Sequence, residues 1–202
     1  MDVEEFKSEL NSKTAREIVE QRLLCSSAEK ATTEYVETVR HRICTSFSIP
    51  SVSVEIVVVG SAKLGFSLVE KEVKGEIKPR YRPFDEDSDI DVAVVSPLLF
   101  ERVWSQLAVY GHKQVPFPWK SKLNHYLLFG WLRPDLFPSD SRPAICKAWW
   151  RVFDGLSSDR SLGFRKTRGG LYYSKEFLAN YQMRAVVECQ IWETSHENDS
   201  NK

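Results

Sequence analysis

The stretch IVVVGSAKLG, residues 56–65, decides the fold together with DEDSDIDVAVV, residues 85–95. The first is an apolar run that ends at Gly60 and Ser61, and the second begins another apolar run with Asp89 and Asp91. Because side chains alternate between the two faces of a β-strand, we expect both aspartates on one face and the apolar residues on the other. The sequence therefore predicts two strands, one followed by a turn and the other carrying paired carboxylates.

Two carboxylates beside a buried apolar face need a cation or hydrogen-bond donors in front of them, because burying an unpaired charge is costly. Mg²⁺ meets this need, since it binds one or two carboxylates, keeps several waters and completes its shell with substrate phosphate oxygens. Gly60 lets the backbone turn and a ligand approach closely. Ser61 adds a hydroxyl where a short helix, expected over residues 62–68, would present free N–H groups to a phosphate.

In these residues the chain resembles the DNA polymerase β-like nucleotidyltransferase superfamily, whose signature is an apolar strand, Gly-Ser, a gap and an Asp-x-Asp strand. The resemblance implies an α+β fold with a nucleotidyltransferase-like mixed β-sheet, flanking helices and an α-helical, Trp-rich C-terminal part. It implies that Gly60 and Ser61 hold the phosphates of a nucleotide. It also implies that Asp89 and Asp91 are the catalytic residues and bind Mg²⁺ or Mn²⁺.

A purely structural role fits the same residues. The acidic run would then be a polar turn before a buried strand, Asp91 would pair with a neighbouring arginine, and Gly60-Ser61 would be an ordinary strand-ending turn. A fold can also persist after its chemistry is lost.

Composition excludes several classes of protein. The 202 residues suffice for one domain with a substantial core, and the formal net charge is zero, so no overall field attracts nucleic acid or a membrane. The four cysteines form no CxxC pair, and the four histidines lack metal-ligand spacing. The N-terminus, MDVEE, is acidic and no apolar run is long enough to span a membrane, so we expect a soluble, cytoplasmic protein.

Residues 1–50 are expected to form N-terminal helices that pack on the core. Apolar residues recur there at steps of three and four, which predicts two helices. The apolar positions are Phe6, Leu10, Ile18 and Leu23 in the first, and Val36, Val39, Ile43 and Phe47 in the second. A break at Asn11-Ser12 would leave the first turns available to a protein partner.

Residues 51–110 are interpreted as the nucleotidyltransferase core. The gap between the two motifs is longer than in compact members of the superfamily, and residues 69–87, VEKEVKGEIKPRYRPFDED, fill it. Glycine, proline and alternating charges predict a loop or hairpin at the mouth of the site. Either its charges balance in solvent, or Tyr81 stacks on a base while cations bind phosphates. The cations are Lys63, Lys78, Arg80 and Arg82.

Residues 111–193 are interpreted as a helical, aromatic region with a late strand and a final helix. Ser96 and Pro97 start the helix that precedes it. Two further helical pieces are predicted at 120–132 and 143–156. The density of tryptophan indicates a buried subdomain. The alternative is a base-stacking platform, for which Tyr126 or Trp131 would be the candidates.

The late strand is predicted over 162–173, with a bend at Gly169-Gly170. Its cluster of Arg165, Lys166 and Arg168 is expected near phosphates, with Arg168 as a phosphate-binding residue. The superfamily commonly has a third metal-binding carboxylate on such a strand, and this strand has none. The nearest acids are Asp154 and Asp159.

The final helix is predicted to start after Ser174, with Leu178, Tyr181, Ala185, Cys189 and Trp192 as its apolar stripe. Residues 194–202, TSHENDSNK, are expected to form a disordered tail.

These observations favour a metal-dependent nucleotidyltransferase. It would transfer a nucleoside monophosphate from an NTP such as ATP to an acceptor hydroxyl and release pyrophosphate. The acceptor stays open between a small molecule, an RNA end and a protein hydroxyl, and no membrane partner is expected. The alternative is a catalytically degenerate nucleotidyltransferase fold that acts as a nucleotide- or protein-binding module. Nucleic-acid binding through the two basic clusters is a third hypothesis, which the zero net charge disfavours.

Overall fold

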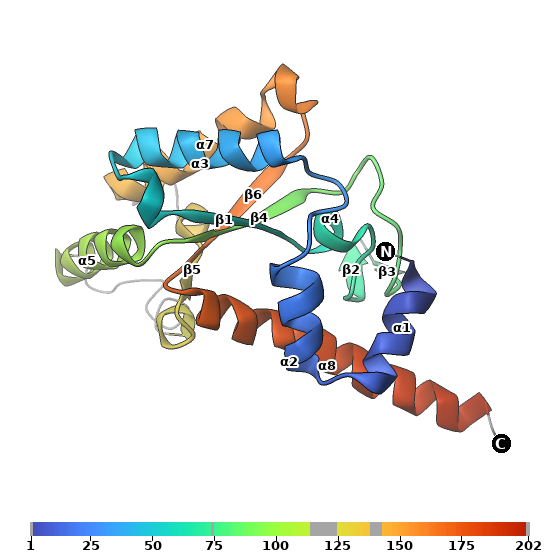
Figure 1. Cartoon of the computed structure of the whole chain (residues 1–202). Helices are drawn as coiled ribbons and strands as arrows, with labels where there is room; N and C mark the ends of the chain where they lie inside the picture. Colours follow the sequence, from blue (N-terminus) through green and yellow to red (C-terminus); the bar gives the residue numbers. More distant parts are fainter. Residues whose placement is uncertain (1, 74, 114–124, 138–142, 201–202) are drawn as a thin grey trace. The chain divides into compact units, whose positions relative to one another are not determined.

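The computed structural model describes residues 2–73, 75–113, 125–137 and 143–200 (Figure 1). The fold is α+β, as expected. The chain forms two compact units: unit one comprises Met1–Ala31, Val59–Ser88 and Ala179–Lys202, and unit two comprises Thr32–Val58 and Asp89–Leu178. This division differs from the expected boundaries at residues 50 and 110, because the predicted core is shared between the units.

Unit two contains a four-stranded mixed sheet with the strand order β1-β4-β6-β5. The strands are β1 (Glu55–Val59), β4 (Ile90–Val95), β6 (Thr167–Tyr172) and β5 (Trp131–Leu132). β4 and β6 run parallel, in a register that pairs Ile90 with Thr167, while β5 runs antiparallel to β6. β4 is central in this order and is buried on both faces from Val92 onward, which explains its continuous apolar run.

Three long helices accompany this sheet: α3 (Thr33–Phe47), α5 (Pro97–Lys113) and α7 (Ala144–Ser157). α3 lies beside α7, and α7 packs against β6 (Figure 1). The predicted start of α5 is confirmed, because the Leu99 N–H donates to the Ser96 hydroxyl at 3.2 Å. Short 3-10 turns complete the unit at η2 (Ser51–Ser53), η3 (Pro134–Leu136) and η5 (Arg160–Leu162).

Two glycines of β6 lie inside the strand, so the predicted bend at Gly169-Gly170 is wrong. A Cβ on Gly169 would lie 2.0 Å from the ring of Phe153 on α7. Glycine is therefore present here because the helix approaches the strand closely, and the chain does not turn.

The helix predicted over 120–132 is also wrong at its C-terminal end. Residues 125–128 are helical, but Trp131–Leu132 form β5 and pair with β6. Gly130 separates the two with a φ of 62°, a conformation in which a helix cannot continue. Residues 120–124 lie outside the described residues. The helix predicted over 143–156 is confirmed as α7.

Unit one is mainly helical. Its elements are α1 (Val3–Ser12), α2 (Ala15–Ile18), the π-helical turn η1 (Val19–Leu24), α4 (Ser61–Leu64), the hairpin β2 (Lys71–Val73)–β3 (Glu76–Lys78), and most of α8 (Lys175–Ser200). The expected break after Asn11-Ser12 is confirmed, because α1 ends at Ser12 and Thr14 begins α2 with a capping box. The hairpin expected within residues 69–87 is also present.

One apolar cluster holds unit one together. Its fully or nearly buried members come from α1 to η1, from the segment after Gly60 and from α8: Phe6, Leu10, Ile18, Val19, Leu23, Leu64, Phe66, Leu68, Ala179, Val186 and Cys189. Residues far apart in sequence thus share one core.

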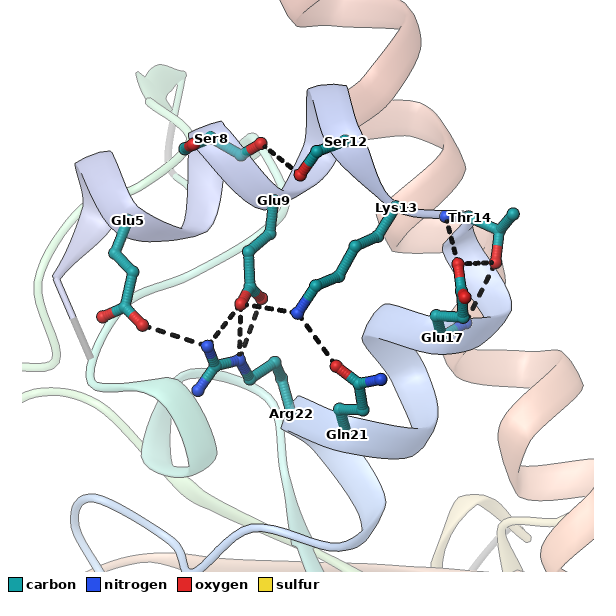
Figure 2. A network of polar contacts seen from close by, with 9 residues as sticks. All are labelled: Glu5, Ser8, Glu9, Ser12, Lys13, Thr14, Glu17, Gln21 and Arg22. Atoms are coloured by element: carbon teal, nitrogen blue, oxygen red, sulfur yellow. Dashed lines mark hydrogen bonds and ion pairs between the residues drawn. The ribbon is translucent and has the colours of Figure 1, made fainter.

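A polar network joins α1 to η1 (Figure 2). The Arg22 guanidinium donates to the Glu9 carboxylate, with Nε 2.8 Å from Oε2, and the Lys13 ammonium reaches the same carboxylate at 2.8 Å. Arg22 also pairs with Glu5 at 3.0 Å, and Lys13 donates to Gln21 at 2.9 Å. Mainly because of the bond from Arg22, the pKa of Glu9 falls to about 2.

The final helix starts where predicted, with the Ser174 hydroxyl accepting from the Phe177 N–H at 3.4 Å. Its expected end near Glu193 is wrong, because α8 extends to Ser200. Trp192 and His196 stack at 3.9 Å, and the hydroxyls of Thr194 and Ser195 donate to carbonyls one turn earlier. These local contacts continue the helix without burying apolar surface. None of the helices in the described ranges is long and apolar enough to cross a membrane.

Candidate functional site

The paired carboxylates of β4 lie as the alternation predicts. Asp89 precedes the strand and Asp91 is its second residue, and both are half-buried. Ile90 and Val92, which alternate with them, are buried to 5% and 1% exposure. The two acids therefore share one face of β4, which lies between β1 and β6 in the sheet.

Arg168 of β6 lies in register with Asp91, its partner across the parallel ladder. Its Nε is 2.9 Å from Oδ2 of Asp89, so the two form an ion pair. The structure thus brings three of the expected site residues together. An arginine pairing of this kind, which the structural alternative expected at Asp91, is present at Asp89.

Tyr35 of α3 also lies near these residues, although it was not among the expected site residues. Its hydroxyl is 2.8 Å from the hydroxyl of Thr167, beside Arg168 on β6. Burial raises the pKa of Tyr35, and the negative charge of Asp91 raises it further. A signal was present, because Tyr35 lies four residues before Val39 on the buried stripe of α3.

The phosphate half of the motif belongs to unit one, and its helix is shorter than the expected span of residues 62–68, because Gly65 ends it in a left-handed conformation. Gly60 follows β1 with φ 66° and ψ −151°, a region that essentially only glycine occupies. Ser61 then begins α4, which ends at Leu64 before Gly65. The strand, Gly-Ser turn and helix are therefore present in order. The convergence of Ser61 with Asp89 and Asp91 stays a prediction.

Lys63 is buried in unit one, with 5% of its surface exposed. Its ammonium donates to the carbonyl of Ser26, and burial lowers its pKa. In this structure the Lys63 side chain fastens α4 to the segment after η1. Its role in phosphate binding stays a prediction, and such a role would require this bond to be exchanged.

The basic tip of the insertion is similarly engaged within unit one. Arg80 donates to the carbonyl of Leu68 at 2.5 Å, and Arg82 donates to the carbonyls of Val69 at 3.0 Å and Pro79 at 3.1 Å. These bonds hold the loop that follows β3. Phosphate binding by Arg80 and Arg82 also stays a prediction.

The rings of both aromatic hypotheses contact other rings, and base stacking by them stays a prediction. The Tyr81 ring makes edge contacts with Phe66 and Trp192, at 6.2 and 6.0 Å. In unit two, the rings of Tyr126 and Trp131 lie 4.4 Å apart, so these two candidates contact each other.

Binding of one Mg²⁺ by the two carboxylates of β4 stays a prediction. Across the described ranges, no group of three or more histidine, cysteine, aspartate or glutamate residues is arranged to hold a metal ion. Asp159, one candidate for a third carboxylate, is bound by Arg42 and by Ser161 instead. Mg²⁺ needs only one or two protein carboxylates when phosphate oxygens and waters complete its shell. Asp89 would have to leave Arg168 to be one of them, and metal binding by Asp89 and Asp91 stays a prediction.

Comparison of the chain with family models, with curated proteins and with solved structures found no significant match in any of the three. The interpretation of the site therefore rests on its own residues and on their geometry.

Proposed function

We propose that the protein is a metal-dependent nucleotidyltransferase that transfers a nucleoside monophosphate from an NTP to an acceptor hydroxyl. The observation that carries this proposal is the strand order, since β1, which leads into Gly60-Ser61, is the hydrogen-bonded neighbour of β4, which bears Asp91. The backbone at Gly60 is compatible with it, because a glycine there lets the chain turn and a ligand approach the backbone closely.

In the proposed reaction the acceptor oxygen forms a bond to the α-phosphorus, and the bond from that phosphorus to the bridging oxygen breaks. Pyrophosphate leaves, and the acceptor loses its proton. Asp89 and Asp91 would hold Mg²⁺, which when bound neutralises charge on the phosphoryl oxygens. The Gly60 turn and Ser61 would bind the outer phosphates through N–H and hydroxyl donors. Arg168, once released from Asp89, would offer its guanidinium to a phosphate oxygen.

The test is pyrophosphate release from each NTP, with Mg²⁺ or Mn²⁺, across small-molecule, RNA and protein acceptors, including the protein itself. We expect turnover that Asp91→Asn lowers by at least about a hundredfold, because a metal ligand is lost. Asp87→Asn is the matched control, since Asp87 is exposed in the preceding turn, and it should retain activity. Turnover that is unchanged in Asp91→Asn would exclude this mechanism.

A second candidate is a module that binds a nucleotide without turning it over. The specific observation in its favour is Arg168, a cation in register with Asp91 on the late strand, where the resemblance implies a third carboxylate. Its ion pair with Asp89 neutralises one of the two remaining acids. This candidate predicts that an NTP raises the melting temperature while no pyrophosphate forms with any acceptor. Measuring both on one preparation separates the two functions.

A further inference from the structure

Unit two has a pocket where α7 faces the start of β6. Its volume is about 380 Å³, and its lining includes Arg133, Trp150, Phe153, Lys166, Arg168 and Gly169. Gly169 contributes no side chain, so the strand backbone and the Phe153 ring form part of the wall. The proposed reaction assigns no role to this pocket apart from Arg168.

Trp150 is an exposed aromatic side chain at this pocket. It is 47% exposed on α7, whereas its neighbour Trp149 is fully buried. Trp149 therefore serves the core, while the Trp150 indole offers surface to solvent. An exposed indole beside a concave site is well suited to stack on a planar ligand.

Cationic side chains line the same pocket as the Trp150 indole. Lys166 is exposed and, within the part of the chain that the structure describes, has no carboxylate partner. Arg133 is held in place by a two-point ion pair with Asp135, at 2.9 and 2.6 Å. Asp154 also lines the pocket, so its lining contains both cations and acids. A ligand that presents an anion toward Lys166 and donors toward the acids would complement this lining.

We propose that this pocket binds a nucleotide, with the base stacked on Trp150 and the phosphate contacting Lys166. The base also carries N–H donors that suit Asp154. The proposal lies outside the proposed function and does not depend on it, because neither Trp150 nor Lys166 takes part in the reaction above. The nucleotide has two sources, a free mononucleotide or one residue of a single strand.

Charge distribution favours the single strand. The zero net charge of the whole chain conceals an asymmetry, since unit two has more lysine and arginine than acidic residues and unit one has the reverse. Positive charge gathered in one unit attracts a phosphate backbone even when the whole molecule is neutral. The zero net charge of the whole chain therefore does not argue against nucleic-acid binding by unit two.

The experiment measures binding of AMP and of labelled single-stranded oligonucleotides, by calorimetry and by fluorescence anisotropy. We expect Trp150→Ala and Lys166→Ala each to weaken binding by about tenfold, as loss of one stacking or phosphate contact does. Trp104→Ala and Lys147→Ala are matched controls, because these residues are exposed in the same unit and do not line the pocket. Melting curves should show all four variants folded.

The two sources differ in salt dependence. The affinity for an oligonucleotide should fall steeply as the salt concentration increases, because many phosphates are bound. The affinity for AMP should change little. If Asp91→Asn leaves binding intact while Trp150→Ala weakens it, the ligand binds at this pocket, even when no turnover is detected. The inference is overturned if neither ligand binds, or if the folded Trp150 and Lys166 variants bind both ligands like the unaltered protein.

Discussion

At the scale of single residues, Arg168 would compete with a metal ion for the Asp89 carboxylate, because the two side chains form an ion pair. Arg168→Ala removes the competing cation, so Mg²⁺ should bind about two- to fivefold more tightly, which corresponds to ~0.5–1 kcal/mol for a solvent-accessible pair. Calorimetric titration with Mg²⁺ alone measures this change. Arg168→Lys keeps the charge and should resemble the unaltered protein more closely. Equal Mg²⁺ affinity in all three proteins would show that Asp89 is not a ligand.

Glu9 carries a pH dependence that is also a property of one residue. Its carboxyl has a pKa of about 2 in the folded protein and an ordinary value of 4.5, so the charged form is the stabilised one. Its contribution is complete above pH 4.5 and is lost as the pH falls toward 2. Glu9→Gln should therefore lower the free energy of unfolding by about 3 kcal/mol at neutral pH, and by progressively less in acid.

Urea unfolding of both proteins across this pH range tests the Glu9 prediction. Glu5→Gln is the control, because Glu5 meets the same Arg22 from a more exposed position. Its effect should stay below about 1 kcal/mol. A Glu9→Gln penalty that is the same at neutral and acidic pH would contradict the electrostatic account.

At the scale of elements, the approach of α7 to β6 depends on Gly169. Gly169→Ala places a methyl group 2.0 Å from the Phe153 ring and should lower the free energy of unfolding by about 1–3 kcal/mol. Gly170→Ala is the matched control, since its nearest neighbour is the side chain of Tyr172 at 3.1 Å, and it should cost less. Adding Phe153→Ala should reduce the cost of Gly169→Ala. Equal effects of the two alanines would argue against close packing as the cause.

Elements with local signals were predictable from the sequence, and those that depend on distant partners were not. β4 and the start of α5 follow from strand alternation and from the Ser96 cap, which lie within a few residues. β5 exists only because β6 pairs with it, and no pattern in two residues reveals that partner. At the candidate site, the Asp-x-Asp geometry and the presence of Arg168 were expected, whereas the pairing of Arg168 with Asp89 and the approach of Tyr35 depend on sheet register and helix packing.

At the scale of the whole molecule, neither unit is a continuous stretch of chain, which the sequence pattern did not reveal. Unit one draws on three separate segments, and its core includes Val186 and Cys189 of α8, both fully buried. Local periodicity identifies an apolar face but does not say which distant segment will cover it. The expected division at residues 50 and 110 followed the order of motifs, while the observed one follows shared cores.

Because three separate segments form the core of unit one, loss of one segment should destabilise the other two. Removing residues 179–202 takes away the α8 side chains that share one buried cluster with Phe6 and Leu10, so unit one should lose its core while the sheet of unit two keeps its own. Hydrogen exchange should then show rapid labelling of residues 3–24, with slow labelling retained in β4 and β6. Removing only residues 197–202, which follow the last member of the core cluster, Cys189, in the sequence, should leave both patterns unchanged. Continued protection of residues 3–24 in the longer truncation would show that α8 is not required for the unit-one core, and loss of protection throughout would show that the two units unfold as one.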